Sequence, residues 1–116
     1  MKNRNQPKEA QVQFRQGDVL IVRVNEIPRE APERKPEAGR VVLAYGEVTG
    51  HAHAFYGGVR WFAPNDQGVG YIEVEGEEPA LLKHEEHTAI PVPPGKYRYT
   101  RQREYVAPEI QRAVAD

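Results

Sequence analysis

The chain contains no cysteine and no serine. Without cysteine it can form neither a disulfide framework nor a thiolate metal site, and this absence fits a protein of the reducing cytoplasm. Without serine, only threonine and tyrosine remain as hydroxyl nucleophiles. The pair Gly57-Gly58 lacks the lysine and the spacing of a phosphate-binding loop. Serine, cysteine and P-loop chemistries are therefore excluded.

Long apolar runs and an excess of basic residues are also missing. No segment approaches the roughly 20 apolar residues of a membrane span, and no hydrophobic segment follows the charged N-terminus. The 16 lysines and arginines are balanced by 17 aspartates and glutamates, which gives a net charge of −1. Phosphate neutralisation needs a basic surface, so this balance argues against nucleic acid as a partner. We expect a soluble, cytoplasmic protein that binds no membrane.

Glycine and proline are plentiful, with ten of each among 116 residues. They divide the chain into short segments, a pattern typical of strands and turns rather than of long helices. Between these breaks lie β-branched, aromatic or alternating runs. The segments with this character are 19–24, 41–45, 53–56, 59–62, 71–75, 80–82, 88–92 and 96–105. There is no room for helical crossovers, so we predict an all-β domain, either a small antiparallel β-barrel or a two-sheet sandwich.

The predicted β-barrel or sandwich domain spans residues 14–106 and leaves two tails. Residues 1–13 are polar and lack periodicity, which predicts a disordered N-terminal arm. Residues 107–116 contain a proline followed by apolar residues at helical spacing, which predicts a short C-terminal helix or tail. Within the domain, residues 26–39 carry three prolines and balanced charge, a composition that predicts a long exposed loop.

Residues 80–87 are compatible with two local structures. Their composition suits a helix, and Pro79 would be well placed as its first residue. The strand-like segment 88–92 follows at once, which favours a strand, a turn and a second strand. We take the strand and turn as the prediction because every neighbouring segment is strand-like.

The four histidines fall into two close pairs, His51 with His53 and His84 with His87. On a strand, residues two apart point to the same face, so the first pair can direct two imidazoles at one point. The second pair would point to opposite faces of an extended strand and can act together only if the segment turns. We expect folding to bring the two pairs to one site.

Converging imidazoles favour a metal centre at His51, His53, His84 and His87. Neutral imidazole is a common ligand of zinc and iron, and such sites need three or four ligands at about 2 Å. The sequence leaves open whether the metal would catalyse a reaction or only stabilise the fold. The histidines could instead make structural hydrogen bonds in turns, or form a pH-sensitive surface patch.

A carboxylate could complete the metal centre. It could act as a ligand, as a partner that fixes an imidazole tautomer, or as a general base. The candidates lie close to the histidines in sequence and are Glu47, Glu85 and Glu86.

The order of strand, Gly46, His51-Ala52-His53 and strand resembles the first motif of the cupin superfamily. Cupins are small β-barrels that hold a metal with two histidines, a glutamate and a distal histidine. The turn Pro93-Pro94-Gly95 is similar to that of the second cupin motif, so the resemblance covers roughly residues 46–95. Residues 54–58 contain no acid where the motif has its glutamate. The pattern from Gln16 to Tyr105 as a whole also resembles small bacterial proteins of unassigned function.

The last predicted strand is rich in arginine and tyrosine. Residues of one strand parity on it are Tyr97, Tyr99, Arg101, Arg103 and Tyr105. Such a face can pack against a neighbouring strand, with arginine stems over tyrosines. It can also bind a protein partner or a second copy of the chain, or form a local nucleic-acid patch. The alternative to a metal protein is therefore a non-enzymatic interaction module or oligomeric scaffold with structural histidines.

Overall fold

The computed structural model describes residues 13–46 and 50–101, which form ten β-strands and no helix. The strands are β1 (Gln13–Gln16), β2 (Val19–Val24), β3 (Glu33–Arg34), β4 (Arg40–Tyr45), β5 (Ala52–Tyr56), β6 (Val59–Phe62), β7 (Gly70–Val74), β8 (Ala80–His84), β9 (His87–Val92) and β10 (Gly95–Arg101). Within these residues there is accordingly no helical segment that could cross a membrane. The predicted helix at 107–116 and the predicted arm, apart from Gln13, lie outside the described residues.

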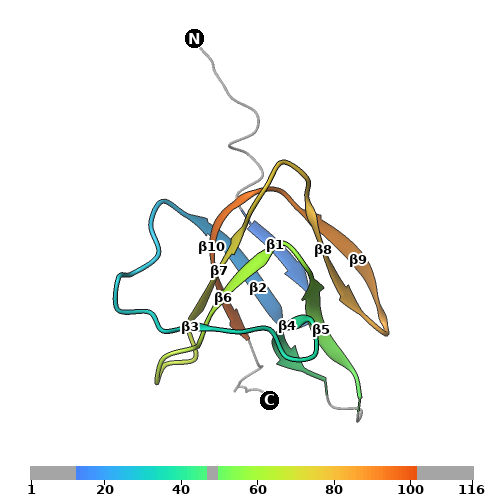
Figure 1. Ribbon diagram of the computed structural model, residues 1–116. Coiled ribbons are helices and arrows are strands. Elements are labelled where there is room, and N and C mark those ends of the chain that lie inside the picture. Colours follow the sequence, from blue (N-terminus) through green and yellow to red (C-terminus); the bar gives the residue numbers. More distant parts are fainter. Residues whose placement is uncertain (1–12, 47–49, 102–116) are drawn as a thin grey trace.

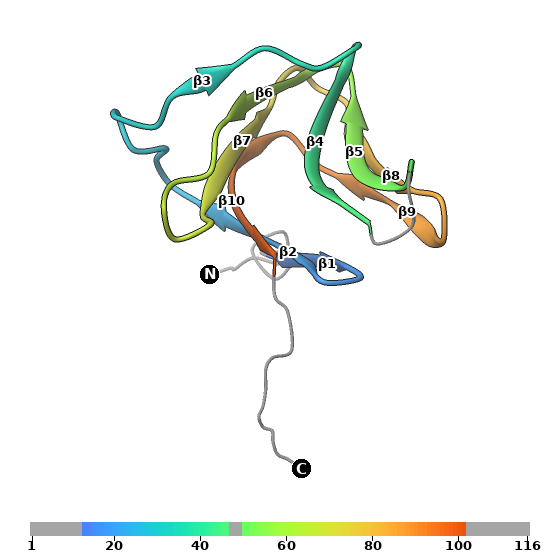
Figure 2. The same cartoon turned by 90° about the horizontal axis from the view of Figure 1, so that it is seen from below.

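The strands form two antiparallel sheets that pack face to face (Figures 1 and 2). The larger sheet has the order β1-β2-β10-β7-β6-β3, and the smaller has the order β4-β5-β8-β9. Both sheets keep free edges among the described strands, so the fold is an open sandwich rather than a closed barrel. The all-β prediction is confirmed, and of its two architectures the structure has the two-sheet sandwich.

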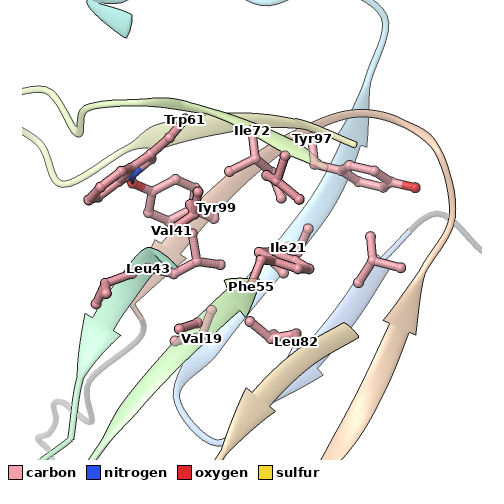
Figure 3. Packing of buried hydrophobic residues seen from close by; sticks show 14 of the residues in the cluster. Val19, Ile21, Val41, Leu43, Phe55, Trp61, Ile72, Leu82, Tyr97 and Tyr99 are labelled. Atoms are coloured by element: carbon pink, nitrogen blue, oxygen red, sulfur yellow. Dashed lines mark hydrogen bonds between the residues drawn. The ribbon is translucent and has the colours of Figure 1, made fainter. Parts of the chain in front are cut away.

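The hydrophobic core lies between the two sheets. Because side chains alternate along each strand, one face of each sheet points its side chains into this space. The larger sheet contributes Val19, Ile21, Trp61, Ile72, Val74, Tyr97 and Tyr99. The smaller sheet contributes Val41, Leu43, Phe55, Leu82 and Val92. Figure 3 shows most of these side chains gathered between the strands. Burial of this apolar surface is the main force that holds the sheets together.

Tyr97 and Tyr99 belong to this core, with only 0% and 2% of their surface exposed. Their hydroxyls are satisfied inside it: Tyr97 donates to the backbone oxygen of Pro93, and Tyr99 accepts from Trp61 Nε1 at 3.0 Å. The prediction that these two tyrosines bind a partner is therefore wrong, because the parity they share is the inward one. Arg103 and Tyr105, from the same prediction, lie outside the described residues.

The segment 26–39 is less irregular than its composition predicts. Its residues Glu33 and Arg34 form β3, which pairs with β6 at the edge of the larger sheet. The guanidinium of Arg34 lies 4.4 Å from the ring centroid of Trp61, and Glu33 pairs with Arg60 at 2.7 Å. The expectation of a continuous loop is thus corrected at these two residues, where side-chain contacts with β6 hold the chain extended.

Residues 80–92 form the β8–β9 hairpin, which confirms the predicted strand and turn. Glu85 and Glu86 occupy the turn, and His84 pairs with His87 across its base. The hairpin therefore brings the two histidines of the second pair side by side, as only a turning segment can.

Substitution Tyr99→Phe should destabilise the protein by about 1–3 kcal/mol, because it leaves the buried indole N–H of Trp61 without its acceptor. Urea denaturation followed by tryptophan fluorescence measures this loss as a lower midpoint at unchanged slope. Tyr56→Phe is the matched control, since Tyr56 is 53% exposed; it should change stability by less than about 0.5 kcal/mol. Equal effects of the two substitutions would contradict the assignment.

Candidate metal centre

Two hairpin turns, the described residues on either side of the β4–β5 connection, and the end of β10 meet at one end of the sandwich (Figures 1 and 2). The turns are Gly17-Asp18 between β1 and β2 and Glu85-Glu86 between β8 and β9, and the flanking residues are Gly46 after β4 and His51 before β5. They enclose an open cavity of about 240 Å³. Its lining residues are Asp18, Gly46, His51, His53, His84, Glu86, His87 and Arg101. The two histidine pairs therefore meet in space, as expected.

The imidazole rings of the four histidines form a connected group in which His84 contacts each of the other three. The ring centroids of His53 and His84 lie 4.3 Å apart, and those of His84 and His87 lie 4.6 Å apart. One potential ligand atom from each of His53, His84 and His87 lies within 4.8 Å of the others. A second group of this kind consists of His51, His84 and Glu85. We call His51, His53, His84 and His87 the histidine cluster.

Gln16 fixes the tautomer of His53. Its amide nitrogen donates to the backbone oxygens of Leu82 and Thr88, both at 2.9 Å. A flipped amide would place oxygen against these two carbonyls, so the amide oxygen must face His53 Nδ1, which lies 2.9 Å away. His53 therefore carries its proton on Nδ1 and leaves the lone pair of Nε2 directed into the cavity.

The free Nε2 of His53 faces a carboxylate. Asp18 Oδ1 lies 3.6 Å from it, while Asp18 Oδ2 accepts a hydrogen bond from Arg101 Nε at 2.8 Å. Burial and the neighbouring His84 lower the pKa of His53 from 6.5 to about 4, although Asp18 opposes this. Burial acts to raise the pKa of Asp18, but the hydrogen bond and the charge of Arg101 outweigh it and lower that pKa. At neutral pH both groups thus present unprotonated lone pairs to the same space.

The predicted carboxylates Glu85 and Glu86 lie in the β8–β9 turn, next to the histidine cluster. Glu85 Oε1 accepts a hydrogen bond from the backbone amide of Ala52, which lowers the pKa of Glu85. Glu86 Oε2 lies 3.2 Å from His51 Nδ1, and the Glu86 amide donates to His84 Nδ1 at 3.0 Å. These contacts attach the β8–β9 turn to the start of β5. The third predicted carboxylate, Glu47, lies outside the described residues.

Gly17 lets the first hairpin approach the rings closely. Its φ is +59°, in the left-handed region, and a Cβ at this position would lie 2.9 Å from His87 Nε2 and 3.1 Å from His53 Cε1. Any other residue would therefore strain the turn and displace the rings.

Sequence reasoning missed Gln16 and Asp18 as parts of the site and placed Arg101 on a partner-binding face. The segment Gln16-Gly17-Asp18 has turn composition, which hides a second role. One signal could have revealed the role of Gln16. Gln16 lies two residues after Phe14 on the same strand, so both side chains point to the same face. Phe14 packs against the core, and the polar amide of Gln16 therefore points inward as well. A polar residue at an inward position needs a buried partner.

Residues 15–102 match the family described as a domain of unknown function, DUF8820. The match covers more than half of the 116 residues, so the chain belongs to this family. All residues that line the cavity fall within the matched range. The comparison with curated proteins gave no match, and neither did the comparison with solved structures.

The stability of the metal-free protein should depend on the charge of His53. Because the pKa of His53 is about 4 in the folded state and 6.5 ordinarily, the unfolded chain binds more protons between these values. The stabilisation is present above about pH 6.5 and should fall by about 2–3 kcal/mol as the pH drops to 4. Urea midpoints in the presence of chelator measure it. His53→Asn keeps an amide donor for Gln16 but cannot be protonated; an equally steep pH dependence in this variant would refute the assignment.

Gly17→Ala should destabilise the protein more than the same change at Gly58. Both glycines have left-handed φ, +59° and +67°, but a Cβ at Gly58 meets nothing within 4 Å. Both substitutions should therefore have the same conformational cost of about 1 kcal/mol, and only Gly17→Ala should also displace the His87 ring. We expect a further loss of about 1 kcal/mol or more in urea denaturation. Equal losses at both positions would mean that the hairpin does not press on the rings.

Proposed function

We propose that this member of the DUF8820 family binds one divalent transition metal ion, zinc or iron, in the histidine cluster. The ligands in this proposal are His53 through Nε2, His84, His87 and the carboxylate of Asp18. The observation that supports it best is the pair of unprotonated acceptors, His53 Nε2 and Asp18 Oδ1, that face each other 3.6 Å apart beside two further imidazoles. Two lone pairs held this close repel each other unless a positive charge lies between them.

The spacing of these two atoms suits a metal ion. Ligand atoms bound at about 2.1 Å in tetrahedral geometry lie about 3.4 Å from each other. The observed 3.6 Å is close to this separation. A proton is a poor alternative bridge at neutral pH, because the pKa of His53 is about 4. A divalent cation satisfies both acceptors without protonating either.

The contacts behind the ligands are those that metal sites use. Metal-binding histidines usually donate their second ring N–H to an oxygen, and His53 donates Nδ1–H to Gln16. Ligating carboxylates are held in turn by hydrogen bonds, and Arg101 holds Asp18 through Oδ2 while Oδ1 remains free. Both ligands are thus oriented before any ion arrives, which reduces the entropy lost on binding.

His84 is the ligand that must change partners. Its Nδ1 accepts the Glu86 amide proton, so in the neutral ring the proton sits on Nε2. Coordination through Nδ1 releases the Glu86 amide, and coordination through Nε2 moves the ring proton to Nδ1 with the same result. Metal binding in this proposal therefore loosens the hydrogen bond that closes the β8–β9 turn.

Three imidazoles and one carboxylate form a donor set that zinc and iron both accept. Tetrahedral zinc would be saturated by these four ligands, whereas an ion of higher coordination number keeps positions open toward the cavity. The resemblance of residues 46–95 to cupin motifs points to the same chemistry. In this proposal Asp18, from the first hairpin, takes the place of the glutamate that residues 54–58 lack.

Elemental analysis of the untagged protein, together with zinc titration in a thermal melt, tests this function. We expect about one equivalent of metal and a melting temperature that rises by roughly 10 °C at a hundredfold excess over the dissociation constant. His53→Asn and Asp18→Asn should each weaken binding by about 100-fold or more. Asp66→Asn, at an exposed aspartate of the turn before β7, is the matched control and should change the affinity by less than threefold. Absence of metal with an unaltered melting temperature would overturn the proposal, as would wild-type affinity in His53→Asn.

A further inference from the structure

One cationic side chain, Arg101, lines the cavity beside the histidine cluster. The register of β10 against β2 places Arg101 opposite Val19, and its Nε therefore reaches Asp18 Oδ2. Within residues 13–46 and 50–101, the two Nη groups of Arg101 have no hydrogen-bond acceptor. The side chain is 28% exposed and is part of the cavity lining, so these donors are accessible to a ligand there.

The guanidinium shape favours one kind of partner. Its five N–H donors form a rigid fork, and after Nε has bonded to Asp18 the two Nη groups remain. A carboxylate can accept two parallel hydrogen bonds from such a guanidinium, an arrangement stronger than a single neutral hydrogen bond. A lysine at this position could also pair with Asp18, but it would not offer a second pair of coplanar N–H donors to a ligand.

Charge and size limit the ligand further. Among the groups that line the cavity, a divalent ion and Arg101 would carry three positive charges, which Asp18 and Glu86 offset only in part, while Glu85 accepts the Ala52 amide outside this lining. The cavity of about 240 Å³ has the volume of roughly eight water molecules. A ligand that fits must therefore be small and anionic.

We infer that the cavity binds a small organic carboxylate, with its carboxylate group on the Nη donors of Arg101 and a second oxygen directed at the metal ion. This inference rests on the proposed metal site and adds its substrate class. Arg101 then has two tasks: its Nε positions Asp18, and its Nη groups select the charge of the ligand.

Titration of the cobalt(II)-saturated protein, followed by visible absorption, tests the inference. Pyruvate is the carboxylate probe, its uncharged analogue pyruvamide is the control, and azide reports binding at the metal alone. Pyruvate should bind at least tenfold more tightly than pyruvamide. In Arg101→Gln the ratio of pyruvate to azide affinity should fall at least tenfold, whereas Arg98→Gln, an exposed arginine of the other parity of β10, should keep it.

The outcomes separate the two proposals. If cobalt gives no ligand-field spectrum, the metal site and the inference built on it both fail. If cobalt and azide bind but pyruvate binds no better than pyruvamide, only the carboxylate inference is overturned. It is equally overturned if Arg101→Gln keeps the pyruvate-to-azide ratio of the unmodified protein.

Discussion

The orientation of one buried side chain, the amide of Gln16, is the constraint on which the candidate metal centre depends. Gln16 belongs to the larger sheet, yet its two amide hydrogens bind the backbone oxygens of Leu82 in β8 and Thr88 in β9, both strands of the smaller sheet. Its oxygen is left for His53 alone. A buried polar network of this kind is stable only when each member is satisfied, and here every hydrogen of the amide is used. The same group thus joins the sheets and sets the ring that faces the cavity.

The protonation states around the cavity follow from burial and charge rather than from the cluster of histidines as such. Burial keeps His53 neutral, and Arg101 keeps Asp18 ionised. Metal ions bind deprotonated ligands and normally have to displace protons to do so. In this fold burial and the Arg101 contact have already removed those protons, so an ion in the proposed site would meet His53 and Asp18 in the required form.

Local sequence patterns predicted much of the fold because strands and turns depend on local chemistry. Alternation and the spacing of glycine and proline predicted eight of the ten strands, all but β1 and β3, and the turn at Glu85-Glu86 followed from the strand-like segment after it. Strand parity and a hairpin accounted for each histidine pair, whereas the meeting of the two pairs was an expectation that depends on the pairing of β5 with β8.

The remainder depended on tertiary contacts that no local pattern contains. Strand parity shows that Tyr97 and Tyr99 lie on the same face of β10, but it does not show whether that face is buried. The tyrosine side chain is amphipathic and suits either a buried or an exposed face. Gln16 and Asp18 flank a glycine in a sequence that any tight turn could have. Their partners, Leu82 and Arg101, are more than sixty residues away. The family match gives the range of the domain but no information about its chemistry, so the candidate metal centre is supported by its geometry alone.

The gathering at one end of residues from the first hairpin, from the β8–β9 hairpin and from the end of β10 determines when the site can form during synthesis. Asp18 comes from the first hairpin and Arg101 from the last described strand, with the histidines between them. No continuous fragment short of nearly the whole domain contains the full set, and closing such long loops costs entropy that is recovered only when both sheets have paired. An ion would be retained only by a finished sandwich, so its capture would mark the completion of folding.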